Sequence, residues 1–388
     1  MGRESPQHAR IAYEQAERLP PFYAASALRL GELLARRGDF AGAEQHLAGG
    51  LRAAPQDLRT REELVAVKQA GGKPEEARAL AEESLAQFPL SFFLSAALGK
   101  PDLPHLANDP DRVLNIAAQY MRLGLYQKAL DVLSLRYPAA IPYESEPGTL
   151  APQNHPMVAY YRGYCLEKLG QTASDFYDRA SKMSTYYVYP STAEEFLVLR
   201  SVVQARPSDA TAHYLLGTFY FSRGLTDQAL GEWSEAHKLG PSLPVVSAST
   251  GLALLHIKND PERALAAFRD GLQSDPNNIA IYMGIDQALS LLNRPAQERV
   301  EALEKYPLMD SAPSGLIFEL ILNLTEAANF ERATQLFHNR FFAREEGGTN
   351  VRQVWVELQL QQALSHSRGG RCGDALTVVD HIGKEVAG

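Results

Sequence analysis

Residues 210–241 contain two stretches in which apolar positions recur every three or four residues, as they do on one face of an α-helix. Arg223 and Gly224 separate the two stretches, and a glycine there suits the left-handed conformation in which helices often end. The recurring positions are Leu216, Gly217, Tyr220, Ala229, Trp233, Ala236 and Pro241. The pattern predicts a pair of helices joined by a short turn, closed by Pro241. We expect Gly217 to face Ala229 where the two helices approach most closely.

The same spacing recurs along most of the chain. In one upstream unit the matching residues are Leu30, Gly31, Leu34, Ala43, Leu47, Gly50 and Pro55. This pattern resembles the tetratricopeptide repeat, which has a period of 34 residues. Because one helix pair cannot bury both of its faces, neighbouring pairs must stack. We therefore expect an all-α fold, a right-handed α–α superhelix of about nine to ten helix pairs.

The departures from the regular period predict the domain organisation. Residues 5–19 match only the second helix of a repeat, so an N-terminal segment, 1–137, is expected to start with a half repeat. Five prolines between 138 and 156 forbid a continuous helix, which makes this a loop whose order stays open. A second segment, 157–388, is expected to end without a covering helix. On this interpretation the chain is a fragment, and its exposed array ends allow self-association.

A narrower resemblance covers roughly residues 60–388. The phrases that carry it include IAAQYMRLGLYQKAL, HYLLGTFYFSRGLTDQALGEW and IYMGIDQALSLL. They resemble the tetratricopeptide array of large bacterial proteins in which a β-rich domain of unknown function precedes the array. The resemblance implies that such a β-rich domain of the same full-length protein is a possible partner.

Composition and charge exclude several classes of function. The net charge of −8 and the lack of a basic stripe disfavour a nucleic-acid partner. No apolar run approaches the ~18 residues of a membrane span, so no membrane partner is expected. The start of the chain lacks the apolar core of a signal peptide, which favours a cytoplasmic location. The only two cysteines, Cys165 and Cys372, exclude a disulfide framework.

The candidate binding surface comes from the resemblance. In such arrays, first-helix positions 2, 5, 9, 12 and 13, counted here with Ala210 as position 1, line a concave groove. The candidates are Tyr160, Tyr164, Lys168, Tyr214, Thr218, Phe221, Ser222, His256, Met283 and Gln287. Tyrosine offers a large contact area and a hydroxyl, so a protein or peptide is the expected partner. The alternative is that Tyr160, Tyr164 and Tyr214 pack against the neighbouring repeat.

The sequence gives no support for catalysis. It contains no HExxH or GxSxG motif and no phosphate-binding loop, so we expect no catalytic, cofactor or metal residues. The two-carboxylate clamp of some tetratricopeptide proteins is also absent, because position 5 has no lysine and position 9 no asparagine. A non-catalytic scaffold is thus the leading hypothesis. Its alternatives are an array that positions the β-rich domain, and an enzyme whose site lies in the loops 138–156 and 343–350.

Overall fold

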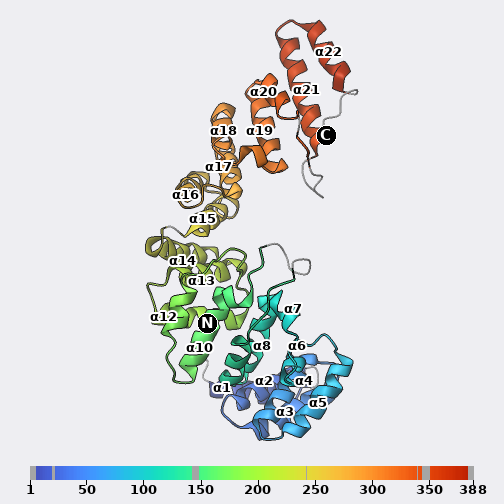
Figure 1. Ribbon diagram of the computed structural model, residues 1–388, viewed down its shortest axis with the longest axis vertical. Coiled ribbons are helices and arrows are strands. Elements are labelled where there is room, and N and C mark those ends of the chain that lie inside the picture. Colours follow the sequence, from blue (N-terminus) through green and yellow to red (C-terminus); the bar gives the residue numbers. More distant parts are fainter. Residues whose placement is uncertain are drawn as a thin grey trace. The chain divides into compact units, whose positions relative to one another are not determined.

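The computed structural model describes residues 6–19, 22–141, 148–241, 243–338, 340–342 and 350–382 (Figure 1). Throughout these ranges the regular elements are helices, which confirms the all-α class and the helical-repeat architecture. The chain forms two compact units, residues 1–223 and 224–388. The boundary between them lies inside the helix pair at 210–241. In sequence, the proline-rich segment 138–156 therefore falls before this boundary, within the stretch of the first unit.

The N-terminal unit contains four regular helix pairs, α2 with α3, α4 with α5, α8 with α9, and α10 with α11. Two short helices, α6 and α7, interrupt the stack after the second pair, and α12 packs against α10 and α13. The helices are α1 (Pro6–Ala16), α2 (Tyr23–Ala35), α3 (Phe40–Ala53), α4 (Leu58–Ala70), α5 (Pro74–Gln87), α6 (Phe92–Ala97), α7 (Leu103–Ala107), α8 (Pro110–Arg122), α9 (Tyr126–Leu133), η2 (Pro152–Asn154), α10 (Pro156–Lys168), α11 (Ser174–Ala180), α12 (Ala193–Ala205) and α13 (Ala210–Ser222).

The C-terminal unit begins with α14 and continues with four pairs, from α15 with α16 to α21 with α22. Its helices are α14 (Thr226–Leu239), α15 (Pro244–His256), α16 (Pro261–Ser274), α17 (Ile279–Leu291), α18 (Ala296–Leu303), η3 (Met309–Ser311), α19 (Ser314–Glu326), α20 (Phe330–Gln335), α21 (Val351–Arg368) and α22 (Cys372–Ile382). First helices of neighbouring pairs pack on one another, as α15 does on α17 and α19 on α21.

Local sequence explains where many of these helices begin and how the paired helices turn. An aspartate side chain accepts a hydrogen bond from the first turn of several helices, as Asp57 does from the Thr60 amide at 3.0 Å. Between paired helices of the N-terminal unit the turn holds a glycine at positive φ, for example Gly170 at 72°. Three of the equivalent turns of the C-terminal unit hold Asn259, Asn293 and Ala328 at φ of 50°, 52° and 58°, whereas the α21–α22 turn holds Gly370 at 76°.

The glycine at position 8 packs on a large side chain of its partner helix in the pairs α2–α3 and α15–α16. The expected contact of Gly217 with Ala229 involves residues of both units and stays a prediction. A Cβ on Gly31 would lie 2.6 Å from the Leu47 Cγ, and a Cβ on Gly251 would lie 2.5 Å from the Phe268 Cε1. In these two pairs the glycine at position 8 therefore faces the large side chain near position 24. The reason is volume, because a bulky side chain fills the space that a missing Cβ leaves.

Candidate partner-binding faces

Tyr160 and Tyr214 lie in the core of the N-terminal unit. The Tyr160 side chain is 0% exposed, and its hydroxyl donates a 2.9 Å hydrogen bond to the Asp209 Oδ1. Asp209 also caps α13 by accepting from the Ala212 amide, so Tyr160 ties α10 to the start of α13. Tyr214 is also buried. Neither side chain offers a surface to a partner, because the neighbouring helices cover both.

Tyr164 and Lys168 are accessible, in contrast to these two residues. Tyr164 is half-buried and Lys168 is exposed, with its Nζ 5.0 Å from the centroid of the Tyr164 ring. Farther along the unit, Thr218 is buried and donates to the Tyr214 carbonyl, whereas Phe221 and Ser222 are exposed at the end of α13. The N-terminal candidates are thus divided between core and surface.

The candidates in the C-terminal unit remain accessible. His256 and Gln287 are exposed, and Met283 is half-buried on α17. Sequence reasoning missed Leu360 and Leu364 as site residues. These two leucines lie one turn apart on α21, with 42% and 46% of their surface exposed. Their signal in the sequence was their repeat position, since they occupy positions 5 and 9 of that first helix.

A cavity of about 510 Å³ opens beside this leucine pair, between α19, the turn to α20, and α21. Its lining residues are Leu322, Thr325, Glu326, Ala328, Phe330, Glu357, Gln361, Ser365 and Arg368. The lining mixes apolar side chains with a few charged ones. That composition suits an amphipathic ligand, because apolar walls supply contact area and the polar groups fix orientation.

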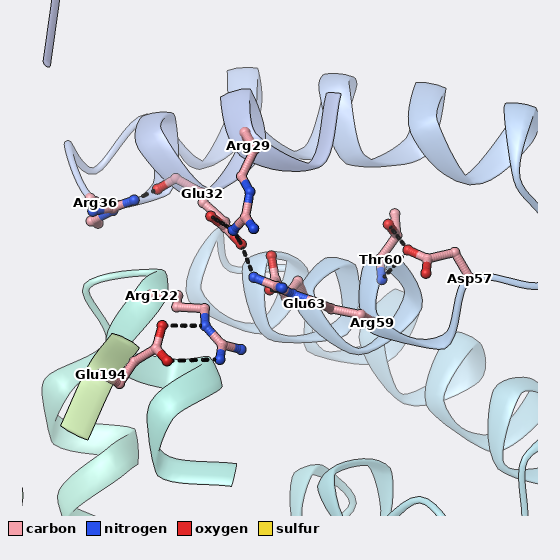
Figure 2. Close-up of polar contacts among 9 residues, drawn as sticks. All are labelled: Arg29, Glu32, Arg36, Asp57, Arg59, Thr60, Glu63, Arg122 and Glu194. Atoms are coloured by element: carbon pink, nitrogen blue, oxygen red, sulfur yellow. Dashed lines mark hydrogen bonds and ion pairs between the residues drawn. The ribbon is translucent and has the colours of Figure 1, made fainter. Parts of the chain in front are cut away.

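Groove positions of the N-terminal unit carry a cluster of ion pairs instead (Figure 2). Glu32 on α2 is almost fully buried, and the Arg29 Nη1 donates to its two carboxylate oxygens at 3.0 and 2.9 Å. Arg59 on α4 bridges two carboxylates, because its Nη2 pairs with Glu32 and its Nε donates to the Glu63 Oε1 at 3.0 Å. One guanidinium thus serves two buried carboxyl groups.

Glu63 is the least satisfied member of the cluster. Its side chain is 0% exposed, and its Oε2 has no hydrogen-bond partner within the described part of the chain. Burial, and after it the charge of Glu32, raises the pKa of Glu63 to about 8, against the opposing effect of Arg59 and Arg122. The Glu63 carboxyl is therefore mostly protonated at neutral pH.

The cluster is bordered by a second pair that joins α8 to α12. The Arg122 Nε and Nη2 donate to the two carboxylate oxygens of Glu194 at 2.7 and 3.1 Å (Figure 2). Such a fork-to-fork contact fixes geometry as well as charge. Sequence reasoning did not single out these residues, although Glu32, Arg59 and Arg122 occupy groove positions 9, 2 and 13.

A possible catalytic arrangement in the C-terminal unit does not have the geometry of a nucleophile and its base. The Ser247 hydroxyl donates to the Asp270 Oδ2 at 2.8 Å, and His237 lies 3.7 Å from the same oxygen. A nucleophilic serine needs a base that takes its proton, and here the serine and the imidazole both approach the carboxylate. Of the two loops expected for an enzymatic site, residues 142–147 and 343–349 lie outside the described residues.

Three further searches bear on cofactors, redox chemistry and membranes. Within the described ranges no group of three or more His, Cys, Asp and Glu side chains could hold a metal ion. Cys165 and Cys372 are free, and burial raises the pKa of Cys165 to about 12. Of the helices described, none is long and apolar enough to cross a membrane.

Comparison with known proteins identifies the repeat. A family model described as a tetratricopeptide repeat matches residues 1–57 and 198–244. No curated protein matches the sequence.

Similar solved structures include MamA from Desulfovibrio magneticus, at 22% identity over 58% of this chain and 99% of that one, with a TM-score of 0.23. A tetratricopeptide repeat protein from Parabacteroides merdae is 14% identical over 81% of this chain and 99% of its own, with a TM-score of 0.29. At such scores these structures carry no argument about binding. The matched stretches and the stacked helix pairs show that the chain contains tetratricopeptide repeats within a helical-repeat fold.

Proposed function

We propose that the chain is a non-catalytic scaffold whose C-terminal unit binds an amphipathic segment of another protein. The binding face comprises the accessible first-helix positions of α15, α17, α19 and α21. One observation carries the proposal, namely the exposed Leu360 and Leu364 beside the cavity between α19 and α21. Single exposed leucines are ordinary on protein surfaces, but two on adjacent turns of a helix that also lines a cavity favour a binding face.

The rest of this face supports the same class of partner. Leu252 and Leu291 are exposed at positions 9 and 13 of α15 and α17, and Met283 and Gln287 lie between them on α17. Methionine and leucine adapt their shape to a partner, and an amphipathic helix places apolar residues every three or four positions. His256, Gln287, Glu357 and Arg368 supply polar contacts at the edges of the face.

The experiment is a selection of peptides on the immobilised full-length chain, followed by affinity measurements. We expect the selected peptides to carry apolar residues at helical spacing. Leu360→Asp with Leu364→Asp should weaken their binding by at least about tenfold, because buried anchors dominate such interfaces. Leu376→Asp is the matched control, since Leu376 is exposed on the second helix α22. Equal binding by the double variant and the control would refute the proposal.

A further inference from the structure

Arg36 and Lys168 are exposed cations for which the described residues provide no carboxylate partner. Arg36 directly follows α2 and Lys168 ends α10, so both occupy position 13 of their repeats. A cation at a helix C-terminus is favoured by the helix dipole, which explains each residue singly. The dipole does not explain why Arg36 and Lys168, which are far apart in sequence, lie near the same pair of tyrosines.

The turn between α8 and α9 brings these residues together. A Cβ on Gly124 would lie 3.1 Å from the Arg36 Cα, so the end of α2 packs directly on this turn. Tyr126 follows the turn, and its ring stands edge-on to that of Tyr164 with 6.2 Å between the centroids. Lys168 lies over the ring of Tyr164, the second tyrosine of this pair.

The electrostatics of the two phenols agree with this placement. Burial raises the pKa of Tyr126 and of Tyr164, and the positive charge of Arg36 opposes the rise in both. The phenols therefore stay protonated at neutral pH and can donate hydrogen bonds. The charge of Glu167 also acts on Tyr164 and adds to the rise of its pKa.

We propose that Arg36, Tyr126, Tyr164 and Lys168 form a docking site for an acidic peptide segment of a partner protein. A side-chain carboxylate of the segment pairs with the guanidinium and the ammonium, and its aliphatic part packs on the tyrosine rings. Charge complementarity selects this occupant. The whole chain carries a net charge of −8, so an acidic segment is repelled everywhere except where cations gather. The site lies in the N-terminal unit and does not depend on the leucine face of the C-terminal unit.

The arrangement also differs from the lysine and asparagine clamp, which this sequence lacks. Its cations come from position 13 of two repeats that are not consecutive, because α4 to α9 lie in sequence between the α2–α3 pair and α10. The planar guanidinium suits a carboxylate, since its donors match the two oxygens. Lys168 adds a point charge, and the tyrosines add contact area with few rotatable bonds.

The test measures fluorescence anisotropy of a labelled glutamate-rich peptide with the full-length chain, and a matched glutamine-rich peptide as the neutral probe. We expect the glutamate peptide to bind and added salt to weaken it. Arg36→Gln with Lys168→Gln should weaken binding by at least about tenfold. Arg78→Gln with Lys182→Gln removes the same charge at exposed positions outside the site and should change binding by less than about threefold.

Two further variants keep the test decisive. If Arg36→Gln disturbs the packing on the α8–α9 turn, Lys168→Gln alone still carries the test, with an expected loss of about threefold or more. Arg36→Glu with Lys168→Glu should reverse the preference and favour a lysine-rich peptide. The proposal is overturned if the glutamate and glutamine peptides bind alike, or if the control double variant loses as much affinity as the site variant.

Discussion

Equivalent groove positions carry different chemistry in the two units of this chain. In the N-terminal unit, positions 9, 2 and 13 hold Glu32, Arg59 and Arg122, which are tied to other charged side chains and largely buried. In the C-terminal unit, the corresponding positions of α17 and α21 hold residues such as Leu291 and Leu364, about half exposed. One repeat architecture therefore supports a face closed by its own ion pairs and a face left open to a partner.

The comparison teaches that a groove position predicts the face of the helix on which a side chain lies. It does not predict whether that side chain is exposed to solvent. A side chain at position 5 can be covered completely, as Tyr160 is, or exposed, as Leu360 is. Each C-terminal feature can be tested against its N-terminal counterpart. Trp233 and Trp355, the only two tryptophans, are both buried in the C-terminal unit, so tryptophan fluorescence reports on that unit alone.

The largest effect is expected from removing a shared guanidinium. Arg59→Ala removes one of the two partners of the buried Glu32 carboxylate and the hydrogen bond that Glu63 accepts, and the loss of hydrogen bonds to a charged group costs about 1.5–3 kcal/mol each. Urea denaturation followed by circular dichroism should show an early loss of helix, whereas the tryptophan transition should hardly move. Coincident early transitions in both signals would mean that the two units unfold as one.

Arg299→Ala is the matched change in the C-terminal unit. Arg299 donates from Nε and Nη2 to the two Asp286 oxygens at 3.0 Å each, and Asp286 is nearly fully buried. For this variant the unfolding transition seen by tryptophan fluorescence should move to a lower urea concentration. An unchanged tryptophan midpoint would contradict the division into units at residue 223.

A smaller loss of stability is expected from substitutions where paired helices meet closely, and this loss should be similar in both units. Gly163→Ala and Gly251→Ala each place a methyl group against a buried ring, that of Tyr177 or Phe268. Such overpacking costs about 1–3 kcal/mol, measured by urea denaturation. Gly231→Ala is the control, because nothing lies near its new methyl group and alanine favours the helix by about 0.5–1 kcal/mol. If the first two substitutions prove harmless, the glycine-to-ring packing described here is wrong.

The free energy of unfolding of the N-terminal unit should depend on pH through Glu63 in its ion cluster. The pKa of Glu63 is raised to about 8 in the folded chain, and the charged groups facing it are Glu32, Arg59 and Arg122. Between the ordinary glutamate range and about pH 8, the folded state holds a proton that the unfolded state has released. Stability therefore falls as the pH rises through this window and levels off above it.

Glu63→Gln should flatten this fall, because an amide does not titrate. The readout is the urea midpoint of the helix signal at several pH values. Asp111→Asn is the matched control. Burial, followed by the charges of Asp109 and Glu195, raises the Asp111 pKa to only about 6, so this variant should change just the lower part of the window. A pH profile of Glu63→Gln identical to that of the parent would exclude Glu63 as the titrating group.

The smallest effect concerns the turns that differ between the units. Ala328 adopts a left-handed conformation with φ of 58°, in a turn equivalent to those that hold glycine in the N-terminal unit. Ala328→Gly should stabilise the chain by about 0.5–1 kcal/mol, because glycine accepts this conformation without steric cost. The tryptophan-detected midpoint measures it. Gly170→Ala in the N-terminal unit should give the opposite sign in the helix signal.

The sequence by itself determined the helix pairs and their order. Period, apolar spacing and the small residues at positions 8 and 20 depend on neighbours within one helix pair, so local reasoning finds them. The capping aspartates and the glycines of the turns are local for the same reason. The boundary at residue 223 was not predicted, because it falls inside a regular pair that has no break in its pattern.

Only the tertiary structure decided which groove residues are accessible and which charges meet. Tyr160 is buried because α13 brings Asp209 to its hydroxyl, and Arg122 meets Glu194 although 72 residues separate them. These contacts depend on how closely first helices of different repeats approach. The short helices α6 and α7 and the irregular α12 set that approach through packing over long sequence distances. A period of 34 residues contains no information about such packing, because the same repeat positions recur whether a neighbour covers them or not.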